Sequence, residues 1–407
     1  MNRIFPTDPF SAYRQFFHLP SNTIYLDGNS LGLLPKAVAD RLQYVIKEEW
    51  GVGLISSWNQ AGWMELPQRV GAQIARLVGV EPADIVVGDS TSVNLFKCLG
   101  AAVQLRPQRR VILAETDNFS TDTYMAEGMA KLLGNGYQVR YLPPNTFDVR
   151  PYLDETVAVA LLTHVHYKTA AKFDMKQVTQ DVHDCGALMI WDLSHSTGAM
   201  PVQLAACQAD FAVGCTYKYL NGGPGSPAFV YASPTIAEQT WQPLSGWLGH
   251  QAPFAFETHY RPNTAILRFI AGTPHILSLS ALHESLKIWE QVDLDALREK
   301  SLALTDLFIQ LLEQTCDGYG LEIVTPRSHE QRGSHVSVAF EHAYPVVQAL
   351  IARGVIGDFR APNIMRFGFA PLYVSFQDVV EAVAHLQDVL ASHEYLAPQF
   401  QTRKSVT

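Results

Sequence analysis

An aspartate and a lysine each follow a short apolar run, at residues 188–191 and 211–215. Asp192 and His195 come after the first run, and Tyr217 and Lys218 come after the second. Both runs are predicted to be buried strands, and open α/β sheets bind ligands at the carboxyl ends of their strands. Pyridoxal phosphate requires such a pair, because a lysine forms the Schiff base and an acid keeps the pyridine nitrogen protonated. A structural Asp–Lys ion pair beside a hydrogen-bonded histidine explains the same residues equally well.

A second candidate feature is a run of hydroxyl side chains where residues 84–88, a predicted strand, lead into a helix. Ser90, Thr91 and Ser92 stand in the first turn of that helix. Helix N-termini carry free backbone N–H groups and the positive end of the helix dipole, which suits a phosphate. A plain N-cap needs only one hydroxyl, so three in succession favour a phosphate site.

Two further strand ends carry polar or aromatic residues. After residues 110–113 comes the cluster Asn118, Phe119, Ser120, Thr121 and Asp122, and after residues 157–162 comes Thr163. Phe119 could stack on a cofactor ring and Thr163 could donate a hydrogen bond to it. His164 and His166 could ligate a metal from one face of a strand, but no third ligand is near. Hydrogen-bonded structural histidines are the favoured interpretation.

The elements that position these residues alternate between strand and helix through residue 231, which predicts a mainly parallel sheet. From residue 276 the pattern changes to two long helices and an α+β tail. We therefore expect an N-terminal arm and helix (1–55) that pack with the small domain, a large cofactor-binding domain (56–275), and a small C-terminal domain (276–407). Arg366 lies inside an apolar strand of the tail, and a buried arginine is rare without an anionic partner. We expect it either to pair with an internal acid or to bind a carboxylate of the substrate.

Composition narrows the class of protein. The chain has 407 residues, of which 47% are hydrophobic and 17% charged, and a net charge of −9. These values are typical of a globular protein with a large core, and the negative charge argues against nucleic-acid or anionic-membrane partners. The N-terminus has no signal-peptide pattern, so we expect a cytoplasmic protein. Five cysteines without CxxC spacing are expected to be reduced, and no metal is expected.

Motifs along nearly the whole chain resemble the kynureninases, above all the bacterial members. These are pyridoxal-phosphate enzymes of the aspartate-aminotransferase fold type (fold type I). The matching stretches are YLDGNSLG (25–32), SWNQAGW (57–63), TSVNLFK (91–97), WDLSH (191–195), CTYKYLNGGPGSPAF (215–229), LSGWLGH (244–250), RGSHVS (332–337), GVIGDFR (354–360) and IMRFGF (364–369). WDLSH and TYKYLNGGPG at their spacing are the most specific of these.

The resemblance implies a role for each matching residue. Lys218 would carry the cofactor, Asp192 would pair with its ring nitrogen and Arg366 would bind the substrate α-carboxylate. Tyr217 would bind the phosphate region, and it is our candidate proton donor. Trp247 and Thr273 would reach the phosphate from the neighbouring subunit, which implies a homodimer. The other implied cofactor-binding residues are Thr91, Ser92, Phe119, Ser120, Thr121, Asp122, Thr163 and His195, and the other substrate-binding residues are Trp58, Gly272 and Asn29.

The implied reaction is hydrolytic Cβ–Cγ cleavage of L-kynurenine to anthranilate and L-alanine, as in tryptophan catabolism or NAD synthesis. Trp58 and Gly272 match an apolar ring pocket, so 3-hydroxykynurenine is expected to be the poorer substrate. Alternatives are an aminotransferase, a cysteine desulfurase or selenocysteine lyase, and a non-catalytic relative. A desulfurase needs a nucleophilic cysteine on a C-terminal loop, and no cysteine follows Cys316. The non-catalytic reading is disfavoured because Lys218, Asp192 and Arg366 are all present.

Overall fold

The computed structural model describes residues 7–403, and its centre is a seven-stranded sheet with the order β2-β8-β7-β6-β5-β3-β4. Strands β3 to β7 pair in parallel, and β8 runs antiparallel to both β2 and β7. The predicted mainly parallel sheet and fold type are confirmed. The strands are β2 (Ile85–Val87), β3 (Val111–Glu115), β4 (Gln138–Leu142), β5 (Val157–Thr163), β6 (Leu188–Asp192), β7 (Phe211–Gly214) and β8 (Phe229–Ala232).

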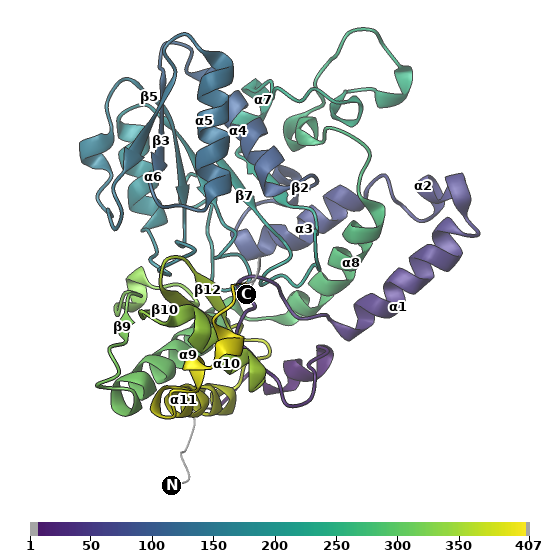
Figure 1. The fold of residues 1–407 in the computed structure, drawn as a ribbon. Coiled ribbons are helices and arrows are strands. Elements are labelled where there is room, and N and C mark those ends of the chain that lie inside the picture. Colours follow the sequence, from purple (N-terminus) through teal and green to yellow (C-terminus); the bar gives the residue numbers. More distant parts are fainter. Residues whose placement is uncertain (1–6, 404–407) are drawn as a thin grey trace.

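Helices cover both faces of this sheet (Figure 1), which is why β3, β5 and β6 are buried along their whole length. One face packs against α4 and α5, for example through Leu99 and Met129. The other face packs against α3 and α6, for example through Ile74 and Val178. The helices are α3 (Leu66–Val78), α4 (Thr91–Leu105), α5 (Ser120–Leu133), α6 (Met175–Asp184), α7 (Pro234–Gln239) and α8 (Ile276–Leu286).

The C-terminal part of the chain forms a second, antiparallel sheet of four strands in the order β12-β13-β10-β9, next to three helices. Strand β12 was not predicted, because three residues are too few to show a strand period. The elements are α9 (Leu294–Thr315), β9 (Glu322–Ile323), β10 (His335–Ala339), α10 (Ala343–Ala352), β12 (Asp358–Arg360), β13 (Ile364–Gly368) and α11 (Phe376–Ala391).

The start of the chain joins the two parts. Strand β1 (Ile24–Tyr25) pairs in parallel with β11 (Val355–Ile356). Gly32 then donates its backbone N–H to the carbonyl oxygen of Tyr217 at 2.8 Å. Helix α8 lies against α1 (Lys36–Tyr44) and α3. The predicted boundaries at residues 55 and 275 stay a prediction.

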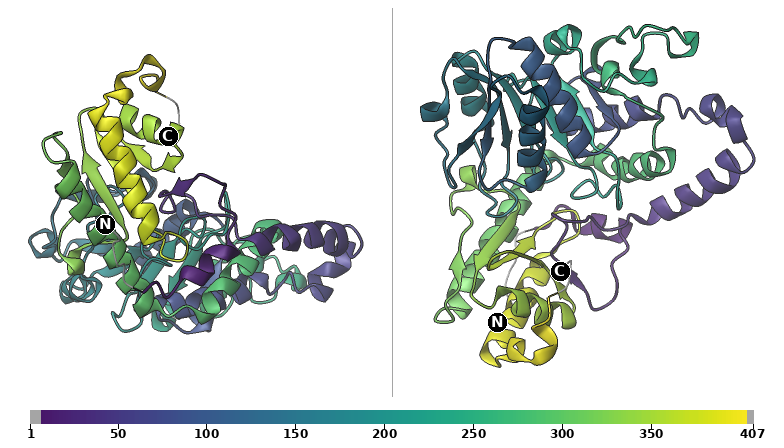
Figure 2. Two further views of the ribbon diagram at one scale, coloured as in Figure 1. Left: turned by 90° about the horizontal axis from the view of Figure 1, so that it is seen from below. Right: turned by 45° about the horizontal axis from the view of Figure 1, so that its top comes forward.

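Helix α1 and the segment after it project from the body as an arm (Figures 1 and 2). The helix continues as a π-helical stretch over Val45–Trp50. The short helix α2 (Ser57–Gln60) follows later in the arm. Large apolar side chains on this arm are exposed, among them Trp50 at 57% and Ile55 at 81%. Such an apolar surface is typical of a protein interface.

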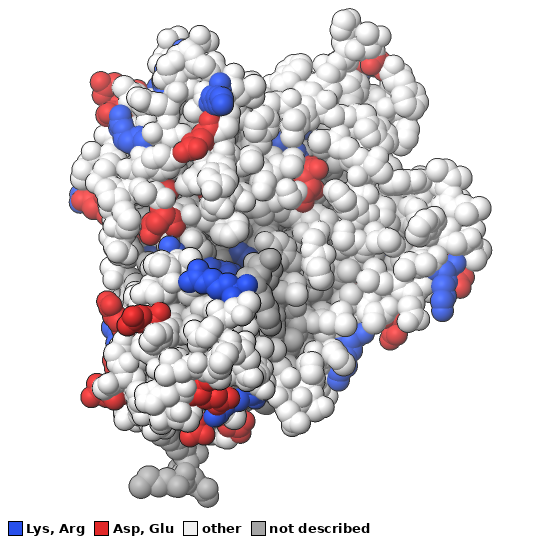
Figure 3. Space-filling model, viewed as in Figure 1, with Lys and Arg blue, Asp and Glu red and all other residues white. Residues whose placement is uncertain are grey.

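Acidic and basic side chains are interspersed over the face drawn in Figure 3, without a basic patch. None of the helices in residues 7–403 combines the length and the hydropathy that crossing a bilayer requires.

Candidate active site

The carboxyl ends of β5, β6 and β7 border a cavity of about 120 Å³, which we call the lysine pocket. It brings together most of the predicted site residues, from five separate stretches of chain. The predicted residues that line it are Thr91, Ser92, Phe119, Thr121, Asp122, Thr163, Asp192, His195, Tyr217 and Lys218. Ligand binding at this edge of the sheet is what its topology predicts.

Lys218 lies beside a histidine that is neutral. Its Nζ is 2.9 Å from Nε2 of His195. Burial, with the charges of Lys218 and Arg366 adding to it, holds the pKa of His195 well below its ordinary value. Nε2 of the neutral ring therefore accepts a hydrogen bond from Lys218, and Nδ1 carries the ring proton.

Two carboxyl groups share the bottom of the lysine pocket. Asp192 ends β6, is 6% exposed, and accepts a hydrogen bond from the backbone N–H of Ser194 at 2.6 Å. Asp122 accepts from Asn118 at 2.8 Å through Oδ2, while its buried Oδ1 has no partner. Burial, and then the charges of Asp192 and Glu115, raise the pKa of Asp122 well above its ordinary value. Asp122 is therefore harder to ionise than an ordinary aspartate, because it is buried beside two other carboxyl groups.

A third buried acid stands behind this pair. Glu115 ends β3 and accepts a hydrogen bond from the backbone N–H of Thr163 at 2.8 Å. Burial raises the pKa of Glu115 to about 7, although His166 and this hydrogen bond oppose the change. Glu115 therefore titrates near neutral pH.

The opposite end of the lysine pocket suits a phosphate. Ser90 caps α4 by accepting a hydrogen bond from the backbone N–H of Val93 at 3.3 Å, which leaves Thr91 and Ser92 in the first turn. The N-terminus of α5 meets it there, since Ser92 Oγ lies 3.4 Å from Thr121 Oγ1. Two helix N-termini thus direct their positive ends at one place, whereas the sequence predicted one.

Two aromatic side chains flank Lys218. Its Nζ is 6.0 Å from the ring centre of Phe119 and 5.9 Å from that of Tyr217. Phe119 is 48% exposed, so its ring is available to a ligand. The neighbouring Cys215 and burial raise the pKa of Tyr217, so its phenol keeps its proton at neutral pH.

Arg366 takes the first of the two alternatives that the sequence left open, because it pairs with an internal acid. Its Nε donates to Oδ1 of Asp358 at 2.8 Å, and its Nη2 donates to Oδ2 at 2.5 Å. Nη2 also donates to Ser30 Oγ at 2.7 Å, and Nη1 donates to the carbonyl oxygen of Tyr167 at 2.6 Å. One of the five guanidinium N–H groups, on Nη1, is left over.

The two histidines after β5 differ. His166 is hydrogen-bonded, with Nε2 3.0 Å from the carbonyl oxygen of Asp117 and Nδ1 3.3 Å from the backbone nitrogen of Thr169. His164 is buried and its Nδ1 has no partner in the described chain. The expectation of hydrogen-bonded histidines is confirmed for His166 and wrong for Nδ1 of His164.

Two contributors to the site, Tyr167 and Asp358, were not predicted, and Asn118 was noted in its strand-end cluster without being given a role. Asn118 and Tyr167 line the lysine pocket, and the ring of Tyr167 contacts that of Phe119 edge-on at 5.5 Å. Both follow strand ends, the signal that found Phe119 and Thr163. Asp358 lies on β12, whose three residues gave no strand signal.

Comparison with known proteins decides the family. The model of the kynureninase C-terminal domain matches residues 297–386. The kynureninase of Pseudomonas fluorescens is 52% identical to this chain over 404 residues, which covers 98% of this chain and 97% of the relative. A kynureninase of Burkholderia pseudomallei is 51% identical with the same coverage. The chain belongs to the kynureninase family.

Solved structures of other pyridoxal-phosphate enzymes share the fold. The cysteine desulfurase of Thermococcus onnurineus NA1 has a TM-score of 0.79 at 18% identity, covering 96% of this chain and 100% of that one. A variant of C-DES with glycine covalently linked to its PLP cofactor also has a TM-score of 0.79, at 14% identity, covering 92% and 99%. Cys316 offers no desulfurase nucleophile, because it is 3% exposed at the end of α9 and burial raises its pKa.

The lysine pocket fits the cofactor of this kynureninase fold. Lys218 stands next to a neutral histidine, Asp192 lines the pocket at the end of β6, and two helix N-termini lie at the other end. The buried Oδ1 of Asp122 also lacks a partner that a ligand could supply. The predictions of the family, of its hydrolase class and of pyridoxal phosphate are confirmed.

Seven predicted residues do not line the lysine pocket of the single chain; one is Arg366, whose partners are given above, and the other six follow. Trp247 is 43% exposed, and its ring contacts that of Phe254. Gly272 and Thr273 are also exposed. The ring of Trp58 contacts that of Trp63. Asn29 is buried against Gly368, and neither polar atom of its side chain has a partner. Ser120 starts α5 beside the pocket without lining it.

Proposed function

We propose that this chain hydrolyses the Cβ–Cγ bond of L-kynurenine and releases anthranilate and L-alanine. The observation that carries the proposal is a lysine, an aspartate and two helix N-termini around one pocket in a member of the kynureninase family. Bound pyridoxal phosphate would withdraw electrons from the substrate and so acidify its Cα proton. The roles of the residues below follow from their positions around that pocket.

Lys218 transfers the proton at Cα of the substrate. Once substrate occupies the pocket, the free amine of Lys218 is the base that takes the Cα proton of the substrate. The neutral His195 at 2.9 Å accepts a hydrogen bond from that amine and so fixes the direction of Nζ. Tyr217 keeps its phenolic proton at neutral pH, so it can protonate the carbon that becomes the methyl group of alanine.

We assign to Asp192 the pairing with the ring nitrogen of the cofactor. Burial and the charge of Asp192 raise the pKa of Asp122, so we assign the contact with the ring nitrogen to Asp192 rather than to Asp122. An ionised carboxylate at this position keeps a ring nitrogen protonated. Ser194 holds Asp192 in place through its backbone N–H.

Substrate binding is assigned to Arg366. Four of its N–H groups already have acceptors, so a substrate carboxylate would take the remaining Nη1 hydrogen and replace the carbonyl oxygen of Tyr167. Asn29, with two unpartnered polar atoms, is the second candidate for a substrate contact.

The active form that we propose is a homodimer. Trp247 and Thr273 are exposed and do not line their own lysine pocket, as expected of residues that complete the pocket of a partner. The exposed apolar arm from Ile46 to Ile55 supplies a surface that a second copy would cover. The same arrangement would bring Trp58 and Gly272 to the substrate ring, where an apolar wall disfavours 3-hydroxykynurenine. On the sequence alone, the location we propose is the cytoplasm.

Product analysis of the purified holoenzyme tests this function. With L-kynurenine we expect anthranilate, detected by fluorescence, and alanine in equal amounts. Release of a transaminated keto acid without anthranilate would instead identify an aminotransferase. The ratio of kcat/KM for L-kynurenine to that for 3-hydroxykynurenine, measured in the same assay, should exceed one.

A further inference from the structure

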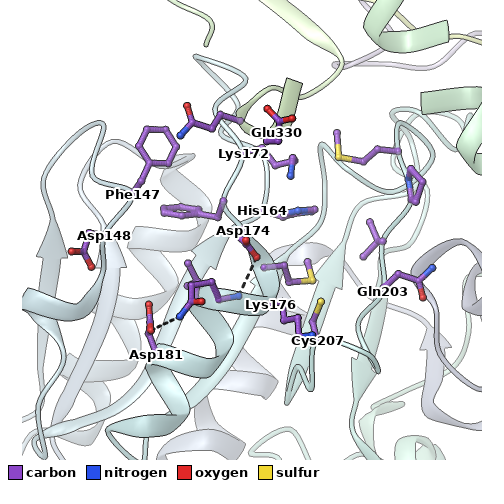
Figure 4. A pocket seen from close by; sticks show the side chains of 18 of the residues that line it. Phe147, Asp148, His164, Lys172, Asp174, Lys176, Asp181, Gln203, Cys207 and Glu330 are labelled. Carbon is purple, nitrogen blue, oxygen red and sulfur yellow. Dashed lines mark hydrogen bonds between the residues drawn. The ribbon is translucent and has the colours of Figure 1, made fainter. Parts of the chain in front are cut away.

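A cavity separate from the lysine pocket lies between the large domain and the C-terminal domain (Figure 4). Its volume is about 980 Å³, which is within the range of small-molecule sites. His164 and Lys172 come from the large domain, and Arg298 and Glu330 come from α9 and the loop before β10. We call it the domain cavity.

Three nitrogen-bearing side chains of the domain cavity lack an acidic partner. Neither Lys172 nor Arg298 forms an ion pair within residues 7–403, and Arg298 donates only to carbonyl oxygens, such as that of Arg332 at 2.6 Å. His164 is 5% exposed and its Nδ1 has no hydrogen-bond partner. In Figure 4, Lys172 and His164 point into the same space.

Burial and the charge of Arg298 raise the electrostatic cost of a charged Lys172. Burial and then Arg298 lower the pKa of Lys172, and burial followed by Arg332 lowers the pKa of Arg298 to about 10. Asp174 and Glu330 act on Lys172 only from beyond ion-pair distance. Asp174 is already used to cap α6, and Glu330 accepts from the hydroxyl of Ser328. An anion between Lys172 and Arg298 would relieve their repulsion.

The wall of the domain cavity also carries the acids Asp148, Asp174, Asp181 and Glu330, and part of it is apolar. Phe147, Phe173, Met175 and Met200 line the domain cavity beside the cations. A bare inorganic anion would leave this surface without contacts, whereas a ring bearing a carboxylate would cover it.

We propose that the domain cavity binds a small aromatic carboxylate, with the carboxylate between Lys172 and Arg298 and the ring against Phe147 and Phe173. The ligand would connect the two domains, because its cationic contacts come from both. It would also act on the active site, since His164 follows Thr163 of the lysine pocket and donates its backbone N–H to the carbonyl oxygen of Asp192 at 2.9 Å. Anthranilate belongs to this class of ligand. A role in sensing that product rests on the proposed function, whereas the binding site does not.

Calorimetric titration of the holoenzyme with benzoate tests the site without any turnover. Lys172→Gln should weaken benzoate binding at least tenfold, because a charge-assisted hydrogen bond is lost. Its fold should persist, because the Lys172 amine makes no hydrogen bond in the described chain. Lys131→Gln, the same charge change on the exposed face of α5, is the control and should bind as the wild type does.

Thermal unfolding gives a second measurement. Benzoate should raise the Tm of the wild type and of Lys131→Gln more than that of Lys172→Gln, because a ligand that binds only the folded state stabilises it. No benzoate binding by the wild type, or equal affinity in Lys172→Gln, would overturn the proposal. Equal affinity would assign the benzoate to another site, such as the lysine pocket.

Discussion

Gly32 is the position where a single methyl group should disturb the catalytic lysine from a distance. A Cβ added there would lie 2.2 Å from the carbonyl oxygen of Lys218 and 2.6 Å from Nδ2 of Asn221. Ordinary contact begins near 3.4 Å, so the turn that carries Lys218 would have to move by roughly 1 Å. Overpacking of this kind costs about 1–3 kcal/mol of stability. A displacement of about 1 Å at reacting groups costs on the order of 100-fold in rate.

We therefore expect Gly32→Ala to fold with a lowered Tm and to lose about two orders of magnitude in kcat. The assay is anthranilate release at saturating L-kynurenine, with the Tm measured on the same preparations. Gly128→Ala is the matched control, because Gly128 is exposed on α5 and an added Cβ meets no atom within 4 Å. That variant should keep its kcat and gain up to about 1 kcal/mol from helix propensity. A Gly32→Ala enzyme with the kcat and Tm of the wild type would refute the contact between the N-terminal segment and the lysine turn.

Three further predictions follow from the buried charges. Asp192→Asn should lower kcat at least 100-fold and weaken cofactor binding, whereas Asp122→Asn should cost less than tenfold, because the raised pKa of Asp122 already disfavours its charge; equal losses in the two variants would contradict the assignment of the ring contact to Asp192. Arg366→Gln should raise the KM for L-kynurenine at least tenfold and lower stability by about 3–5 kcal/mol, because Asp358 loses a buried partner; an unchanged KM would remove Arg366 from substrate binding. Because the folded-state pKa of Glu115 is raised to about 7, its contribution to stability is fully present below its unfolded pKa and is lost as pH rises toward 7. That loss amounts to about 3 kcal/mol. Denaturant unfolding should therefore show a smaller fall in stability between pH 5 and pH 8 for Glu115→Gln than for the wild type. Parallel pH profiles of the two proteins would count against a buried, titrating Glu115.

The sequence predicted the parts of the site that depend on strand ends and helix starts. Asp192, Lys218, Thr163 and the hydroxyls of α4 sit directly after or before regular elements, and chain direction in a parallel sheet brings such positions to one edge. Tyr167 and Asn118 follow the same rule and could have been chosen with the same signal. The resemblance to kynureninases added the assignments that no local pattern carries, such as Trp247 and Thr273.

Other features depend on contacts between distant segments, which local patterns do not reveal. Asp358 meets Arg366 across β12 and β13, and the first of these strands has only three residues. The contact of Gly32 with the lysine turn joins residues far apart in the chain. The neutral state of His195 results from complete burial next to two cations, which hydrophobic periodicity does not encode.

The central claim, that Lys218 holds the cofactor in the pocket bordered by β5, β6 and β7, is tested most directly by chemical trapping. The holoenzyme is reduced with borohydride, digested, and its peptides are analysed by mass spectrometry. We predict a single pyridoxyl modification on Lys218, together with loss of the visible absorption band and of anthranilate release in Lys218→Ala. Modification of a different lysine, or an unchanged absorption band in Lys218→Ala, would contradict the account.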